Sequence, residues 1–343
     1  MKHSCLSHHL LKENREKIFI LITTYNRFCL LRQIITYYFI SNRVFSFIVT
    51  SMNISSTLLF ESWLLALDIT MMIFLILSIL LGSLFLFIIF FDRTCHTICM
   101  ILVANSFLAQ ILLASNILSM VIVSLINDIE QIDRQDSFCV FRGYLSYTLT
   151  AIMNYSFLLQ ALYRYVIVVY PTQLFWQTKK IQLLLICLTW VYGFLYPSKF
   201  IFTGDIIYNA NNQLCQIPLK LSFSLLFTIC NAYLIPVTII QMIYLKLIRY
   251  VTKVGTRIIT RYTFYRNQRE LKMIRQIVII LTILVLLGLP YTLFIFMSFF
   301  TDPPKYHFRI AGVFINLSLT FVVIALFQLT DPLKASVLKK MNI

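Results

Sequence analysis

Seven long segments without a formally charged residue dominate this sequence. Each contains 18 or more residues, enough for a helix rising 1.5 Å per residue to cross the ~30 Å hydrocarbon core of a bilayer. A closed β-barrel would instead show short segments in which apolar and polar residues alternate. The sequence therefore predicts an all-α, seven-transmembrane helix bundle. The segments are 69–91, 97–127, 143–163, 181–198, 221–245, 276–301 and 310–330.

The composition agrees with a multi-pass membrane protein. Of the 343 residues, 59% are hydrophobic and 12% are charged, too much apolar surface for a water-soluble globule to bury. We expect an N-terminal segment (1–63), a bundle domain (64–330) and a short cytoplasmic tail (331–343). The tail sequence LKASVLKK has one apolar face and one lysine face, which predicts a short amphipathic helix after the seventh span, lying on the membrane surface.

The formal charge of +16 is distributed unevenly along the chain. Segment 246–275 holds nine basic residues and one acidic residue, whereas segment 128–136 holds four acidic residues. Basic loops stay in the cytosol, so we expect a plasma-membrane protein with its N-terminus outside and its C-terminus in the cytoplasm. The basic loops would then face anionic membrane lipid or an acidic protein surface, and no nucleic-acid partner is expected.

The first 51 residues fit this scheme poorly. Arg27 and Arg32 interrupt the apolar stretch 18–38, which favours an interfacial helix over an eighth span. The alternative is that the natural chain begins at Met52 and that the preceding residues are not part of it. Asn53 starts the sequon Asn-Ile-Ser and is a predicted glycosylation site.

Several single residues mark the spans in order. Cys139 and Arg164 are 25 positions apart, at opposite ends of the third segment, and Pro236 and Pro290 lie within the fifth and sixth. A proline inside a span frees a backbone carbonyl and permits a bend, so both prolines are predicted hinges.

Together these landmarks resemble the rhodopsin-like family of G-protein-coupled receptors. The resemblance covers roughly 64–340 and is carried by features on successive helices. They are the spacing of Cys139 and Arg164, the sequence Tyr163-Arg164-Tyr165 in place of Asp/Glu-Arg-Tyr, Trp190, Pro236 followed by Tyr244, and Pro290 preceded by Glu270.

The resemblance implies a receptor that passes an extracellular ligand signal to a heterotrimeric G protein by outward movement of helix six. The alternative is a non-signalling or decoy relative. A transporter is disfavoured because the seven segments carry no ionisable residue at mid-membrane. An enzyme is not expected, since no nucleophile with a base and no metal cluster lies in the spans. No cofactor is expected.

At the inner end, the resemblance implies a switch built on Arg164. Glu270 is the only acid in its loop, and an ion pair with Arg164 would hold the resting state. Tyr163 replaces the usual acid beside Arg164, and Tyr165 follows it. Tyr244 is interpreted either as a gate that faces Arg164 or as an interfacial anchor.

At the outer end, the resemblance implies a disulfide between Cys139 and Cys215. Both lie in outer loops, where conditions are oxidising; the alternative is two free thiols. The other six cysteines show no CxxC pairing, so they are assigned to packing and no metal site is predicted.

A ligand pocket is expected between the outer halves of helices three, five, six and seven, although residues at such positions can also serve packing alone. Ser146 stands where amine receptors carry an acid, which argues against biogenic amines. Helix seven has no lysine, which excludes a retinal Schiff base. The candidate pocket residues are Ser146, Tyr147, Thr150, Thr228, Tyr291 and Phe294.

The sequence also departs from the family pattern. Ser83 and Gln110 replace the family's helix-one Asn and helix-two Asp, and Phe327 stands for the helix-seven tyrosine. Gln110 is interpreted as a hydrogen-bonding centre for helices one, two and seven, with Asn105 near it, or else as a residue that bonds its local backbone. Because 287–290 reads Leu-Gly-Leu-Pro, the aromatic switch of helix six is missing.

Overall fold

The computed structural model describes residues 57–92, 96–132, 134–255, 288–301, 304–330 and 333–334. The chain divides into two compact units, Met1–Trp63 and Leu64–Ile343. Of the first unit, the structure describes only the opening turns of the first described helix. The account below concerns the second unit.

Long helices make up most of the described part of this unit. Within the described residues, six helices are long and apolar enough to cross a membrane, and the short helix Gly288–Met297 is the described part of the predicted sixth span. The helices are α2 (Thr57–Phe91), α3 (Ile98–Glu130), α4 (Cys139–Val169), η2 (Leu174–Gln177), α5 (Lys179–Leu195), α6 (Lys199–Thr203), α7 (Phe223–Ile229), η3 (Cys230–Leu234), α8 (Ile235–Gly255) and α10 (His307–Leu329).

Most helices extend beyond the uncharged segments that predicted them. The helices therefore include charged residues that lie just beyond the ends of the uncharged segments. Asp68 lies within α2, Asp128 within α3 and Arg309 within α10, and the side chains of Asp68 and Arg309 are buried. A charged residue ends an uncharged run, but it does not end a helix whose interior supplies an opposite charge.

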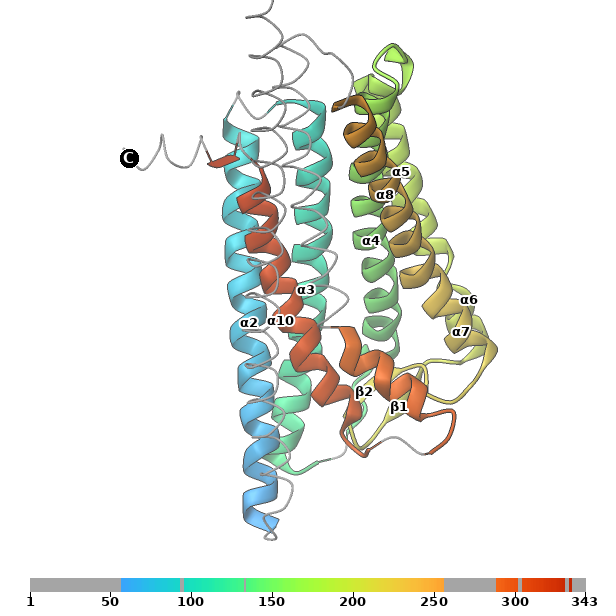
Figure 1. The fold of residues 1–343 in the computed structure, drawn as a ribbon. Coiled ribbons are helices and arrows are strands. Elements are labelled where there is room, and N and C mark those ends of the chain that lie inside the picture. The colour runs from blue at the N-terminus through green and yellow to red at the C-terminus, as the bar shows by residue number, and fades with distance from the viewer. Residues whose placement is uncertain are drawn as a thin grey trace, which may run out of the picture. The chain divides into compact units, whose positions relative to one another are not determined.

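Helix α4 is the centre of the bundle. It packs against α3, α5 and α8, and in Figure 1 it runs between α3 on one side and α5 and α8 on the other. Glycine makes one of these approaches possible, because a Cβ on Gly193 of α5 would overlap the Ile152 side chain of α4. Small residues at such contacts let helix backbones come close in a membrane.

The fifth span consists of three consecutive pieces. The α-helix α7 passes into the π-helical turn η3, and α8 continues with Pro236 as its second residue. In the π-turn, the Ile235 N–H donates to the Cys230 carbonyl, which is an i to i−5 bond. A π-turn of this kind inserts one extra residue into a helix, often at a functional site.

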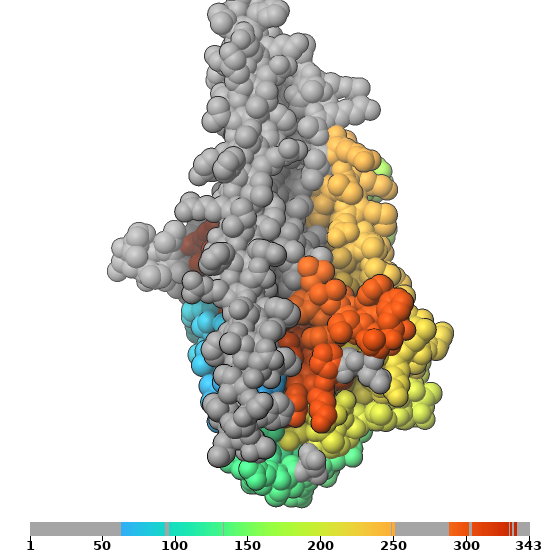
Figure 2. Space-filling view, turned by 60° about the horizontal axis from the view of Figure 1, so that its bottom comes forward, coloured from blue at the N-terminus to red at the C-terminus, as the bar shows by residue number. Residues whose placement is uncertain are grey.

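A two-stranded hairpin lies at the Cys139 end of α4. Strands β1 (Ile207–Asn209) and β2 (Leu214–Gln216) pair antiparallel, with Tyr208 opposite Cys215. Strand β2 packs against α4, and Figure 1 shows the hairpin beside the start of α10. In Figure 2 this end of the molecule presents green, yellow and orange surfaces side by side, so segments distant in sequence meet here.

The hairpin's approach to α4 depends on Gly143. A Cβ added there would overlap the Cys215 carbonyl oxygen, which is backbone and cannot rotate away. We predict that Gly143→Ala lowers the free energy of unfolding by about 1–3 kcal/mol, the usual cost of overpacking. Thermal unfolding of the detergent-solubilised protein would measure it.

Gly288→Ala is the matched control, because a Cβ there meets only the Tyr233 hydroxyl at 3.5 Å, an ordinary contact. Equal unfolding temperatures for the two variants would contradict the close approach of the hairpin to Gly143.

Candidate ligand-binding site

The predicted disulfide between Cys139 and Cys215 is confirmed. It joins the first residue of α4 to the middle of β2 over a Cα–Cα distance of 5.4 Å, and both residues are buried. The bond fixes the hairpin over the end of the bundle, and a covalent tie of this kind stabilises mainly by restricting the unfolded chain.

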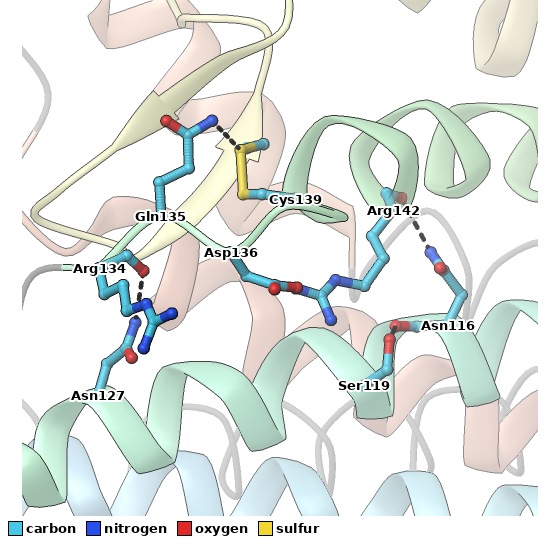
Figure 3. A network of polar contacts seen from close by, with 9 residues as sticks. Asn116, Ser119, Asn127, Arg134, Gln135, Asp136, Cys139 and Arg142 are labelled. Atoms are coloured by element: carbon cyan, nitrogen blue, oxygen red, sulfur yellow. Dashed lines mark hydrogen bonds and ion pairs between the residues drawn. A yellow bond between two sulfur atoms is a disulfide. The ribbon is translucent and has the colours of Figure 1, made fainter.

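Polar side chains hold the connection between α3 and α4 around this disulfide (Figure 3). Asn127 Nδ2 donates to the Arg134 carbonyl at 3.1 Å, and the Gln135 amide lies 3.9 Å from the Cys215 sulfur. Asp136 accepts a charge-assisted bond from Arg142, and Asn116 Nδ2 donates to the Arg142 carbonyl at 3.0 Å. The connection is therefore fixed to both helices that it joins.

The tip of the hairpin is tied to the start of α10 by Asn212. Its Nδ2 donates to the Lys305 carbonyl at 3.0 Å, and its Oδ1 accepts from the backbone N–H groups of Phe308 and Arg309 at 3.2 and 3.4 Å. The first N–H groups of a helix have no partner within it. Asn212 therefore acts as an N-cap supplied by a distant part of the chain.

The base of the hairpin carries a partly exposed carboxylate held by hydroxyls. Thr203 Oγ1 and Ser224 Oγ both donate to Asp205, the second at 2.8 Å. These hydrogen bonds, with a smaller contribution from nearby Lys199, lower the pKa of Asp205 below its ordinary value. The arrangement links the end of α6 to the start of α7.

A cavity of about 290 Å³ lies beneath the hairpin, inside the bundle. Its volume is close to the lower limit for small-molecule sites, which are mostly apolar with a few placed polar groups. Residues of α2, α3, α4, β2, the fifth span, the helix Gly288–Met297 and α10 all line it. Apolar lining residues include Met71, Leu113, Ile117, Met120, Leu225, Ile229, Ile295, Phe308 and Leu319.

Most of the predicted pocket residues line this cavity, namely Ser146, Tyr147, Thr150, Thr228 and Tyr291. Tyr147 is held in place, because its hydroxyl accepts from the Ile217 N–H at 3.0 Å. The Ser146 hydroxyl accepts from Asn116 Nδ2 at 2.8 Å. Phe294 is not among the lining residues; its ring centre lies 6.3 Å from that of His307. The role of these residues as ligand contacts stays a prediction.

The cavity also reaches a buried ionic cluster that sequence reasoning missed. The Arg309 guanidinium binds both carboxylate oxygens of Asp128, with Nη2 to Oδ1 at 3.1 Å, and its Nη1 lies 3.5 Å from Asp68 Oδ2. The side chains of Arg309 and Asp68 are 2% and 0% exposed. Arg309 and Asp68 line the cavity, and so does Asn316, seven positions after Arg309 on α10. No local pattern in the sequence indicates this cluster, because its three charged residues lie far apart along the chain.

The backbone carbonyl that Pro236, a predicted hinge, leaves without its usual donor is bonded by a side chain of another helix. A proline at this position lacks the N–H that would bond the carbonyl four residues earlier, which is that of Ala232. Asn154 of α4 donates to this carbonyl instead, from Nδ2 at 2.7 Å. The buried Asn154 therefore stabilises the π-turn in the fifth span, and both Asn154 and Ala232 line the cavity.

At the other end of α4, Arg164 is buried beside Tyr244 of α8. Neither Arg164 Nη1 nor the Tyr244 hydroxyl has a hydrogen-bond partner among the described residues. Tyr244 is itself buried, and its role as a gate or as an interfacial anchor stays a prediction. Glu270 and Asn53 lie outside the described residues, so the predicted lock and the glycosylation site stay predictions.

Mid-bundle polar residues bond between helices. Gln110 Nε2 donates to the Leu319 carbonyl of α10, as expected for a centre that joins helices two and seven. Asn105 faces elsewhere: its Nδ2 donates to Ser156 Oγ at 2.7 Å, and its Oδ1 accepts from Trp190 Nε1 at 2.9 Å. The expectation that Asn105 belongs to the Gln110 centre is therefore wrong, because its position on α3 points it toward α4 and α5.

Within the described ranges, no group of three or more His, Cys, Asp or Glu side chains is placed to hold a metal ion.

Comparisons with known proteins agree with this architecture. The chain matches the family "7 transmembrane receptor (rhodopsin family)" over residues 82–332. The crystal structure of squid rhodopsin is similar to this structure, with a TM-score of 0.69 and 12% sequence identity, over 82% of this chain and 86% of that one. No curated protein matches the sequence.

The fold and the family match together define a rhodopsin-type, seven-transmembrane bundle. This chain belongs to the rhodopsin-like family of G-protein-coupled receptors. At 12% identity, the likeness to squid rhodopsin concerns the fold alone.

We predict energetic coupling between Asn154 and Pro236. Asn154→Leu should lower the free energy of unfolding by about 1–3 kcal/mol, the cost of leaving the buried Ala232 carbonyl without a donor. In a Pro236→Ala background the cost should fall, because the new backbone N–H at position 236 can satisfy that carbonyl. A double-mutant cycle on thermal or denaturant unfolding measures the coupling; additive effects would contradict the assignment.

Proposed function

We propose that this protein is a plasma-membrane receptor that passes a ligand signal to a heterotrimeric G protein. The ligand would occupy the cavity beneath the hairpin, and the Arg164 end of the bundle would face the cytoplasm. The observation that carries the proposal is that one helix, α4, lines the ligand cavity near one end and presents buried Arg164 at the other. A rearrangement of α4 and its neighbours can therefore link the two ends.

The mechanism we propose is a shift between two populated states. Ligand binding favours the state in which helix six moves its Arg164-side end outward from α4, with Pro290 as the hinge. In that state the Arg164 guanidinium leaves Tyr244 and contacts the G protein. In this step Arg164 also loses its ion pair with Glu270. Breaking a shielded ion pair costs free energy, which the new contact between Arg164 and the G protein offsets.

A decoy relative that does not signal is the second candidate. It is favoured by the sequence Leu-Gly-Leu-Pro at 287–290, which lacks the family's aromatic switch. Nucleotide exchange separates the two candidates.

We predict that Arg164→Ala reduces receptor-catalysed nucleotide exchange on the G protein to the uncatalysed rate, because the guanidinium is the proposed contact. Glu270→Ala should raise the ligand-free rate by removing the resting ion pair. Both variants would be reconstituted with purified heterotrimers and compared with the wild-type chain.

Equal exchange by the wild-type chain and Arg164→Ala would overturn coupling through Arg164. An unchanged ligand-free rate in Glu270→Ala would overturn the lock alone.

The proposed orientation gives a separate prediction. Exposed Asn211 on the hairpin and exposed Gln173 beside η2 should lie on opposite sides of the membrane. With a membrane-impermeant thiol reagent on intact cells, Asn211→Cys should be labelled above the wild-type background and Gln173→Cys only after permeabilisation. Labelling of both in intact cells would contradict the topology.

A further inference from the structure

The ionic cluster defines the class of ligand that the cavity takes. Asp68 and Arg309 are the only carboxylate and cationic side chains among the described residues that line it. The remainder of the wall is largely apolar, and charges in such surroundings interact more strongly than in water.

The cluster holds more carboxylates than cationic groups. Its two carboxylates, Asp68 and Asp128, share the single guanidinium of Arg309. Arg309 forms a two-point contact with Asp128, the strong geometry for this pair, and reaches Asp68 only at 3.5 Å. Arg309 thus makes its closer contact with Asp128, while its Nε and Asp68 Oδ1 both lack a hydrogen-bond partner among the described residues.

Several buried polar atoms of residues that line the cavity have no hydrogen-bond partner among the described residues. Asp68 Oδ1 is buried without a hydrogen-bond partner among the described residues, and so are both amide atoms of Asn316. Asp68 is 0% exposed and Asn316 is 1% exposed, and both line the cavity. Buried polar groups in folded proteins are normally paired, so these atoms are open positions for a ligand group.

We propose that the ligand is a compact organic cation: an apolar body that fills the cavity beneath the hairpin and a protonated amine that binds Asp68 Oδ1 and Asn316 Oδ1. The amine would bind at the wall formed by α2 and α10, whereas Ser146, on α4, accepts a hydrogen bond from Asn116. The absence of an acid at position 146 therefore does not exclude an amine ligand. The carboxylate that would bind the amine lies in another wall of the same cavity.

This inference rests on the proposed function only in that the cavity is the ligand site, and its test uses binding rather than signalling. The probes are 4-phenylbutylamine, 4-phenylbutanol and 4-phenylbutyrate, which share one apolar body and carry a cationic, neutral or anionic head group. Binding to the purified full-length chain in detergent would be measured by calorimetry and by the shift in unfolding temperature.

We expect the amine to bind about 10- to 100-fold more tightly than the alcohol, the usual gain from a buried charge-assisted hydrogen bond. Asp68→Asn should remove most of this preference while leaving alcohol binding unchanged. The matched control is Asp136→Asn, which removes a carboxylate that pairs with Arg142 outside the cavity lining and should keep the amine preference.

Three results would overturn the proposal: no measurable binding of the amine at millimolar concentration, equal binding of amine and alcohol, or an undiminished preference in Asp68→Asn. Preference for the butyrate would assign the site to Arg309 and an anionic ligand instead. If Asp68→Asn unfolds, Asn316→Leu tests the same position, with a smaller loss of amine preference expected. Failure of nucleotide exchange would leave all of these binding results unaffected.

Discussion

The bundle depends on pairing its backbone polar groups internally, because hydrocarbon offers no alternative partner. Helices satisfy most of their own backbone. Where a helix is interrupted, another helix supplies the missing bond, as Asn154 does for the Ala232 carbonyl that Pro236 leaves free. The same constraint explains why Thr320 of α10 bonds the Phe74 carbonyl of α2 at 2.9 Å. The same hydrogen bonds therefore hold neighbouring spans together and satisfy the backbone where a span is interrupted.

The sequence predicts the helices well because long uncharged runs have few structural solutions in a membrane. It predicts their ends poorly, and the ends are where the ionic cluster lies. Run length treats Asp68 and Arg309 as boundaries, whereas in the folded chain each charge is stabilised by the other. Long-range pairing between α2, α3 and α10 is not visible in any local window, so the charged wall of the cavity could not be predicted.

Predictions that rested on single residues differed in accuracy, because some of these residues depend on side chains from other helices. The disulfide followed from two cysteines in adjoining loops. Pro236 marked the correct helix, but the π-turn before it depends on Asn154, 82 positions earlier. Asn105 was placed on the wrong face because a helix-two residue can turn toward either side, and only the partners Ser156 and Trp190 decide which. Side-chain direction, more than secondary structure, limited the sequence prediction.

The cap that Asn212 places on α10 has a mechanical consequence. One amide group is shared by the hairpin tip and by the helix that carries Arg309, and the disulfide fastens the same hairpin to α4. A macromolecule that binds the hairpin from outside would therefore act on α4 and α10 at the same time, without a ligand in the cavity. The hairpin thus covers the cavity and also connects the two helices mechanically.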